Sequence, residues 1–297
     1  MASDTLATVP IANVLFEFDP VLRLADALVL RWQTVALVAV ISAALIVTGL
    51  IARREGLRPD DLLFIAVATV PGALVGGRLG YVLLHLEYYG ANRTAVFDPG
   101  QGSLELGLAV IGGVLSGAYV AALLGAPLGH WMRTTALPLL LLLGAGKLAM
   151  VLGGTGQGQP ADLPWATAYA GAGPWGSLAA AVPAHPAQAY EGLATLALLL
   201  VLTLARAAGA FAARDGRLLV VAIGGWAVVR AVVSTTWRDP ILVAGLNAAG
   251  LVAVAIAIGA GIAFVVMSRR RAGAGATTDA DGGRDVTWAD PEARPRF

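Results

Sequence analysis

The chain has 297 residues, of which 58% are hydrophobic and only 13% are charged, and its formal net charge is +1. Soluble globular proteins carry about a quarter charged residues, and one water-soluble core of this size does not hide so much apolar surface. The composition excludes a soluble enzyme, a disordered chain and a nucleic-acid-binding protein, and it indicates an integral membrane protein.

The first segment, residues 1–32, mixes apolar residues with Glu17, Asp19 and Arg23. This pattern predicts an N-terminal amphipathic segment that lies in the outer membrane interface. No basic residue precedes Arg23, so we expect no cleavable signal peptide.

Seven segments follow that are long and apolar enough to cross a bilayer core, which takes about 20 residues. The sequence therefore predicts an all-α integral membrane protein, with a bundle of about seven transmembrane helices over residues 33–267. The predicted spans are 33–52, 62–85, 104–124, 134–153, 188–208, 217–236 and 242–267.

Two further regions lie outside the predicted spans. Residues 154–187 are rich in Gly, Pro and Ala and predict an outer-face loop region. We expect its aromatic residues to lie at the level of the lipid headgroups; they are Trp165, Tyr169 and Trp175. Residues 268–297 predict a disordered cytoplasmic tail.

Basic residues predict the orientation, because cytoplasmic loops carry more of them. One side of the predicted bundle holds Arg53, Arg54, Arg58, Arg133, Arg206, Arg214, Arg217, Arg269, Arg270 and Arg271. The other side holds Arg23, Arg31, Arg93 and Arg238. The bias predicts an outward N-terminus and a cytoplasmic C-terminus.

Three basic residues, Arg78, Lys147 and Arg230, fall inside predicted spans. Each costs about 2.5–3.5 kcal/mol on insertion scales. Each side chain either reaches the interface or bonds backbone carbonyls, or the three face the bundle interior and bind an anion. Because Glu105 and Glu191 fall near span ends, we expect no acid to balance them and favour a lipid phosphate as the counter-charge.

Two other groups of residues are candidates for binding. The glycine pair Gly112 and Gly113 either lets two helices approach closely or opens backbone N–H groups to a ligand. In Ala184–Glu191, the side chains of His185, Gln188 and Glu191 have the spacing of one helix face and suggest a binding surface at the outer interface. Glu191 has an alternative, purely structural interpretation near a helix N-terminus.

Metal and cofactor chemistry finds no support in the sequence. Cysteine is absent, which excludes disulfides, thiolate metal sites and a cysteine nucleophile. The three histidines, His85, His130 and His185, lie far apart in the sequence and do not favour a metal site. We expect no metal and no cofactor.

Several motifs together resemble the prolipoprotein diacylglyceryl transferase family over about residues 12–267. They are FEFDPVLRLADALVLRW, VGGRLGYVLL with Arg78, LGAGKLAMVLGG with Lys147, HPAQAYE, and the basic positions Arg230 and Arg238. The resemblance implies a bacterial cytoplasmic membrane enzyme that transfers diacylglyceryl from phosphatidylglycerol to the lipobox cysteine of preprolipoproteins. The implied partners are these precursors and phosphatidylglycerol or another anionic lipid.

The resemblance also implies roles for individual residues. Arg230 and Lys147 are the implied catalytic residues. The implied substrate-binding residues are Arg78, Gly112, Gly113, His185, Gln188, Tyr190, Glu191 and Arg238.

The sequence departs from the family pattern at polar positions. Ile111 stands where the family has a histidine that is often proposed to act on the thiol, and Lys147 replaces an arginine. Further departures are Gln33, Met150, Thr155, Trp226 and Ser234. These changes leave two alternatives open: a catalytically degenerate homologue that binds anionic lipid or lipoprotein precursor, and a transferase with a changed donor or acceptor.

Overall fold

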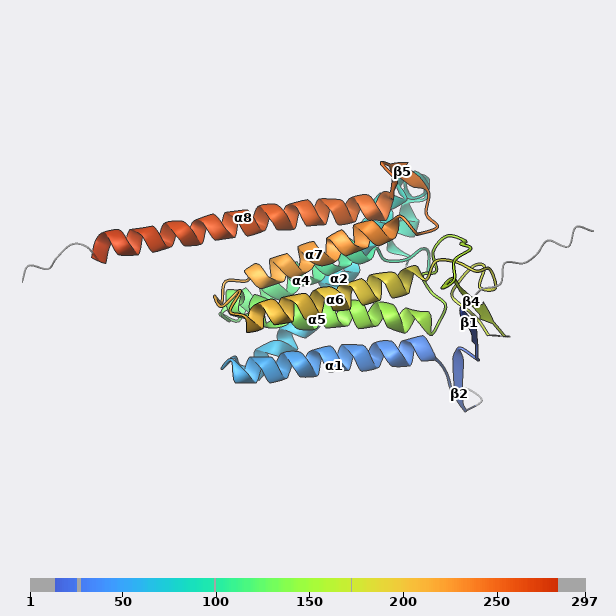
Figure 1. Cartoon of the computed structure of the whole chain (residues 1–297), viewed down its shortest axis with the longest axis horizontal. Helices are drawn as coiled ribbons and strands as arrows, with labels where there is room; N and C mark the ends of the chain where they lie inside the picture. The colour runs from blue at the N-terminus through green and yellow to red at the C-terminus, as the bar shows by residue number, and fades with distance from the viewer. Residues whose placement is uncertain (1–13, 26–27, 99, 172, 283–297) are drawn as a thin grey trace, which may run out of the picture.

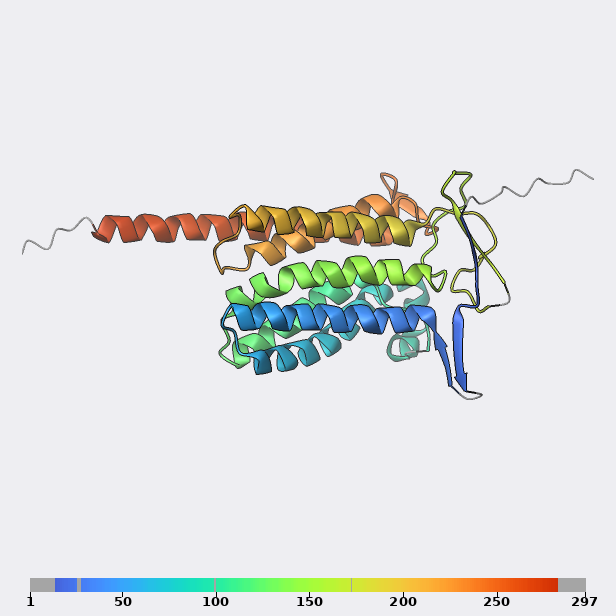
Figure 2. The same ribbon diagram turned by 60° about the horizontal axis from the view of Figure 1, so that its bottom comes forward.

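The computed structural model describes residues 14–25, 28–98, 100–171 and 173–282. The chain forms an elongated bundle of roughly parallel helices, with the strands and longer loops gathered at one end (Figures 1 and 2). We call this the strand end of the bundle.

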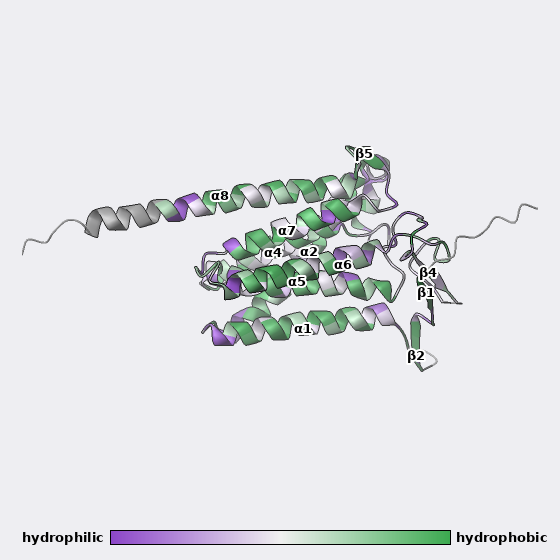
Figure 3. Cartoon of the chain, viewed as in Figure 1, coloured by the Kyte–Doolittle hydropathy of each residue, from purple (hydrophilic) through white to green (hydrophobic). Residues whose placement is uncertain are grey.

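The predicted bundle is confirmed: within the described residues, seven helices are long and apolar enough to cross a membrane. They are α1 (Trp32–Arg54), α2 (Pro59–Leu84), α4 (Leu106–Leu123), α5 (Leu128–Val151), α6 (Ala187–Ala207), α7 (Arg217–Ser234) and α8 (Ala248–Gly282). Inside a bilayer a helix satisfies its own backbone hydrogen bonds. Apolar residues cover the helices along most of their length, and polar residues gather at the ends (Figure 3).

The hydrophobic core lies between α5, α6 and α7. Its centre is Trp226 of α7, which is fully buried together with Ala222 and Ala136. Ile111 of α4 packs against the same cluster. The position where the related family has a histidine is therefore part of the apolar packing of this protein.

Glycines bring α2 and α4 into backbone contact. A Cβ atom on Gly112 would lie 2.2 Å from the carbonyl oxygen of Gly72, and one on Gly76 would lie 2.3 Å from the carbonyl oxygen of Leu108. A Cβ on Gly113 would lie 3.2 Å from the Thr69 side chain. This geometry supports the helix-packing interpretation of the Gly112–Gly113 pair.

Three short two-stranded sheets form the strand end. The strands β1 (Val14–Glu17) and β4 (Thr167–Ala170) pair in parallel, β2 (Val21–Ala25) pairs antiparallel with β3 (Leu28–Arg31), and β5 (Ile241–Val243) pairs antiparallel with β6 (Leu246–Asn247). The short helices α3 (Leu86–Ala91) and η1 (Arg93–Phe97) connect α2 to α4. The predicted seventh span therefore starts later than residue 242, because β5 and β6 form a hairpin first.

Two features of the flanking regions were not predicted. Tyr169 is 1% exposed and packs between the rings of Phe16 and Trp175, at 5.1 and 4.8 Å, and its level relative to the headgroups stays a prediction. The helix α8 continues to Gly282, past residue 268 where the predicted tail begins, and the disorder of the tail stays a prediction. The alanines and arginines that follow Met267 favour helix. Residues 1–13 and 283–297, which belong to the predicted N-terminal segment and tail, lie outside the described residues.

The end of the bundle opposite the strands is held by ion pairs of Glu55, which follows α1. Its carboxylate accepts hydrogen bonds from His130 Nε2 at 2.6 Å, from Arg133 Nη1 at 3.1 Å and from Arg206. Burial alone would raise the pKa of Glu55, but the His130 hydrogen bond and the charges of Arg133 and Arg206 outweigh it and hold the pKa below its ordinary value. Two arginines predicted to be cytoplasmic thus share one end of the bundle.

Candidate charge cluster inside the bundle

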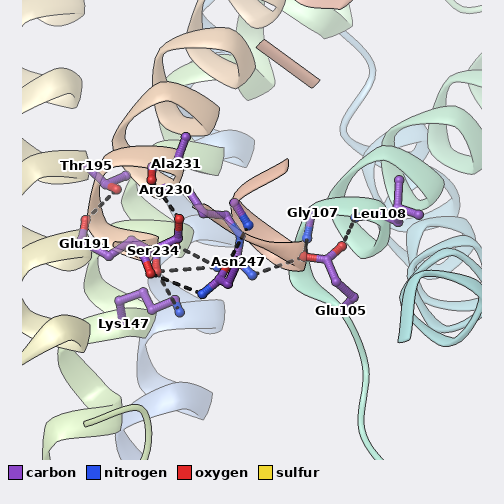
Figure 4. Close-up of polar contacts among 11 residues, drawn as sticks. Glu105, Gly107, Leu108, Lys147, Glu191, Thr195, Arg230, Ala231, Ser234 and Asn247 are labelled. Atoms are coloured by element: carbon purple, nitrogen blue, oxygen red, sulfur yellow. Dashed lines mark hydrogen bonds and ion pairs between the residues drawn. The ribbon is translucent and has the colours of Figure 1, made fainter. Parts of the chain in front are cut away.

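Four charged side chains meet inside the bundle, toward the strand end (Figure 4). Arg230 of α7 lies between two carboxylates: Nη1 donates to Glu191 Oε1 and Nη2 donates to Glu105 Oε1, both at 3.1 Å. Lys147, near the end of α5, places Nζ 2.8 Å from Glu191 Oε2. We call these four residues the charge cluster.

The expectation that no buried acid balances Lys147 and Arg230 is wrong. Glu191 is 0% exposed and Glu105 is 5% exposed. Glu191 is only the fifth residue of α6, yet α5 and α7 flank it with Lys147 and Arg230. Two cations and two anions make the cluster formally neutral, so a lipid phosphate is not required as a counter-charge.

Glu105 has a second role as the N-cap of α4. Its Oε1 accepts the N–H of Gly107 at 2.8 Å and its Oε2 accepts the N–H of Leu108 at 2.6 Å. These are two of the backbone donors that a helix start leaves unpaired. The Glu105–Arg230 ion pair therefore fixes the start of α4 against α7.

Trp237 lies over both cations. The centre of its ring is 4.6 Å from Arg230 Cζ and 5.5 Å from Lys147 Nζ. A cation over the face of an indole ring is attracted by the ring quadrupole. The indole thus helps to hold both cations beside Glu191.

The two cations differ in access. The Arg230 side chain is 5% exposed, whereas the Lys147 side chain is 14% exposed. Within the described part of the chain, Arg230 Nε has no hydrogen-bond partner, and the carboxylate that Lys147 Nζ contacts is that of Glu191. An ammonium group has three N–H donors. Lys147 is therefore the more accessible of the two cations, and its ammonium keeps N–H donors for an anionic ligand.

Arg78 lies apart from the charge cluster. Its guanidinium donates to backbone carbonyls of the connection between α2 and α4: Val96 at 2.7 Å, Gln101 at 2.6 Å, Ala95 at 2.6 Å and Asp98 at 3.0 Å. The interpretation that a basic residue bonds backbone carbonyls is therefore confirmed for Arg78. A substrate-binding role for Arg78 stays a prediction.

Gln188 and Glu191 are buried and His185 is half-buried, and the binding surface that their spacing suggests stays a prediction. Gln188 is 1% exposed and donates to the Tyr169 hydroxyl at 3.1 Å. Burial raises the pKa of Tyr169 to about 12, against the opposing hydrogen bond from Gln188. His185 Nδ1 lies 3.4 Å from the Tyr190 hydroxyl.

Tyr190 and Arg238 both contact the loop region of residues 154–187. The Tyr190 hydroxyl accepts a hydrogen bond from Trp165 Nε1 at 2.6 Å. Arg238 Nε donates to the Gly158 carbonyl at 2.6 Å. These two predicted substrate-binding residues hold loops over the strand end, and their roles toward a substrate stay predictions.

Two members of the site were missed at the sequence level. Glu105 carries a local signal, because the helix dipole favours an acidic residue at the start of an apolar helix. Trp237 carries no such signal, because it reaches Lys147 only through the packing of α5 against α7. Within the part of the chain that the structure describes, no three His, Asp or Glu side chains are grouped so that they could hold a metal ion.

Comparison with known proteins places the chain in a family. A family model described as prolipoprotein diacylglyceryl transferase matches residues 20–267. The phosphatidylglycerol–prolipoprotein diacylglyceryl transferase of Methylibium petroleiphilum is 31% identical over 252 residues, which are 79% of this chain and 89% of that protein. The proteins of the same name from Geobacter sulfurreducens and Clostridioides difficile are 31% and 25% identical, over 59% and 68% of this chain and 66% and 77% of their own lengths. The chain therefore belongs to the prolipoprotein diacylglyceryl transferase family.

Proposed function

We propose that this protein transfers the diacylglyceryl group of phosphatidylglycerol to the lipobox cysteine of a preprolipoprotein. Relatives that align with up to 89% of their own length carry this activity in their names. The similarity favours this function over a catalytically degenerate homologue. The single observation within the chain that carries the proposal is Lys147, a partly accessible cation held beside Arg230 by Glu191 inside a membrane bundle.

The reaction is a substitution at carbon. The cysteine sulfur attacks the glycerol carbon that carries the phosphate, a C–S thioether bond forms, and the C–O bond to the phosphate breaks. The leaving glycerol phosphate takes the electron pair, so its phosphate changes from a singly charged diester to a monoester with up to two negative charges. The thiol proton passes to a base or to water.

The cations of the charge cluster are suited to stabilise the negative charge that grows on the leaving phosphate. A cation that contacts the phosphate stabilises the transition state more than the ground state, because negative charge grows on the leaving oxygen. Lys147 has the access for this contact. Arg230 is held by Glu105 and Glu191 and adds positive charge next to it. Glu191 orients both cations.

The thiol proton has no evident acceptor on α4, because Ile111 packs against the hydrophobic core. A free cysteine thiol has a pKa of about 8.5, so a few per cent is thiolate at neutral pH. We infer that the reaction uses this pre-formed thiolate and that water or buffer takes up the proton.

The position of the charge cluster agrees with a substrate that enters from the outer side. Glu105 precedes α4, Glu191 lies in the first turns of α6, and Lys147 and Arg230 lie near the ends of α5 and α7. All four lie toward the strand end, which the distribution of basic residues predicts to be outside. We infer that the protein lies in the bacterial cytoplasmic membrane with its N-terminus outside and its C-terminus in the cytoplasm.

The experiment that tests the function combines purified protein, phosphatidylglycerol and a lipobox peptide, with mass spectrometry of the peptide. We expect a mass gain of one diacylglyceryl unit and an equal amount of free glycerol phosphate. Lys147→Gln lowers the yield, and Lys147→Arg, which keeps the charge, restores it. If phosphatidylglycerol gives no product while another anionic phospholipid does, the donor is changed. If no phospholipid gives product, the protein is a non-catalytic member of its family.

A further inference from the structure

An open surface cavity of about 490 Å³ lies at the end of the bundle opposite the strands, far from the charge cluster. It is formed between the connection from α6 to α7 and the side of α8. The residues that line it are Ala213, Arg214, Asp215, Met267, Arg270 and Arg271. Half of these residues are arginines, and the structure assigns to the cavity a second lipid-binding site, which takes the phosphate headgroup of an anionic phospholipid.

The charge of the cavity suits one phosphate group. Asp215 is its acidic member, and its carboxylate is shared by Arg217 at 2.8 Å and Arg271 at 3.5 Å. Within the described part of the chain, Arg214 and Arg270 form no ion pair with an acid. Arginine presents a planar fork of N–H donors that matches a phosphate.

The boundary position of the cavity points to a lipid. On α8 the apolar residues Ile262, Val265 and Val266 are exposed, and the arginine run Arg269–Arg271 begins three residues after Val266. In Figure 3 the ribbon of α8 changes from mostly hydrophobic to hydrophilic residues near this place. Such a change marks the level where the hydrocarbon of the bilayer meets the headgroups. A phospholipid phosphate on the arginines would leave its acyl chains along the apolar face of α8.

Lipid bound in this cavity has a consequence for helix packing that lipid bound at the charge cluster does not share. Asp215 joins the start of α7 to α8 through Arg217 and Arg271. A phosphate bound by Arg214 and Arg270 adds a second link between the same two segments. Bound lipid is therefore expected to stabilise the packing of α8 on α7, independently of any transferase activity.

The arginine run offers matched variants for a test. Arg270 and Arg271 line the cavity, whereas their neighbour Arg269 does not. Arg269→Gln and Arg270→Gln remove the same charge from adjacent exposed positions of one helix. If the basic segment is attracted only diffusely to an anionic membrane, the two variants weaken lipid binding equally. A specific site in the cavity predicts weaker lipid binding for Arg270→Gln only. Arg214→Gln tests the opposite wall of the cavity.

The experiment uses the full chain in phosphatidylcholine nanodiscs that contain a small fraction of phosphatidylglycerol, with bound lipid counted by native mass spectrometry. The wild-type protein and Arg269→Gln retain the lipid of this site. Arg270→Gln and Arg214→Gln each weaken its binding by about tenfold, the loss expected for one charged hydrogen bond. Lys147→Gln leaves it in place, which separates this site from the charge cluster.

Three results would overturn the proposal. Equal weakening by Arg269→Gln and Arg270→Gln, or no weakening by either, would show that no specific lipid site exists at this cavity. Displacement of the lipid by millimolar glycerol phosphate at an unchanged phosphatidylglycerol fraction would show that the cavity binds a soluble phosphate instead of a lipid. Melting temperatures of all variants, measured without anionic lipid, confirm that each variant is folded.

Discussion

The ammonium of Lys147 lies 2.8 Å from the carboxylate of Glu191, which also accepts a hydrogen bond from Arg230. The carboxylate thus holds two cations side by side inside a membrane bundle. Without Glu191 the two cations would repel each other, and with it they form a place where a third, anionic group can be bound at low cost.

Glu191→Gln is expected to destabilise the protein by about 3–5 kcal/mol, because it removes the buried negative charge that pairs with Lys147 and Arg230. The check is thermal unfolding in detergent. The double variant Glu191→Gln with Lys147→Met removes one charge of each sign and is expected to be more stable than Glu191→Gln alone. If the loss of stability in the double variant equals the sum of the losses in Glu191→Gln and in Lys147→Met alone, the Lys147–Glu191 ion pair contributes nothing to folding.

Glu105→Gln tests the link between α4 and α7. The amide keeps one oxygen for the N–H groups of Gly107 and Leu108 but loses the charge that pairs with Arg230. We expect a loss of about 1–3 kcal/mol and a reduced transfer rate, measured by unfolding and by peptide mass. Wild-type stability and a wild-type transfer rate in Glu105→Gln would show that the charge of Glu105 plays no part in the site.

The pH dependence of the transfer rate tests how the thiol loses its proton. With Ile111 in place of a base, the rate per enzyme follows the thiolate fraction and rises about tenfold per pH unit until it levels near the thiol pKa of about 8.5. The profile is measured with the lipobox peptide in excess. A plateau reached near pH 6.5 would instead reveal a protein base of histidine-like pKa.

Gly112→Ala is expected to disrupt the packing of α2 on α4, because its Cβ would lie 2.2 Å from the backbone oxygen of Gly72. We expect a large drop in melting temperature. Gly259→Ala in α8 is the matched control, since no atom lies within 4 Å of its added Cβ. That variant is expected to keep or slightly raise the stability, because alanine favours helix by about 1 kcal/mol over glycine.

The lowered pKa of Glu55 predicts how the stability of the folded protein depends on pH. Its pKa is lowered in the folded protein from an ordinary value of 4.5, so its contribution is fully present above that value and is lost as the pH falls through the lower, folded-state pKa. Unfolding measured between pH 7 and pH 3 tests this. Glu55→Gln should be less stable at pH 7 and should show a weaker loss toward acid; parallel curves for both proteins would refute the role of Glu55.

The seven helices were predictable because each carries about 20 apolar residues, a signal that needs no knowledge of packing. The hairpin of β5 and β6 was not, because its apolar strands resemble the start of a span. A turn at Ala244 and Gly245, both with positive φ, separates them.

The charge cluster was predictable only in part. Arg78 and Arg230 look alike in the sequence, since each is flanked by apolar residues, but the first bonds loop carbonyls and the second bonds two acids. Glu105 and Glu191 seemed too close to span ends to be buried. Their burial depends on neighbouring helices and on the loops of the strand end, which no local pattern reveals.

The proposed role of Lys147, to stabilise charge on the leaving phosphate, is tested by the kinetics of Lys147→Gln and Lys147→Arg with phosphatidylglycerol and a lipobox peptide. Loss of a group that stabilises developing negative charge costs about 10²–10³ in kcat. We therefore predict a kcat lowered by this factor in Lys147→Gln with a small change in KM, and recovery of most of the rate in Lys147→Arg. A wild-type kcat in Lys147→Gln would show that Lys147 does not stabilise the leaving phosphate.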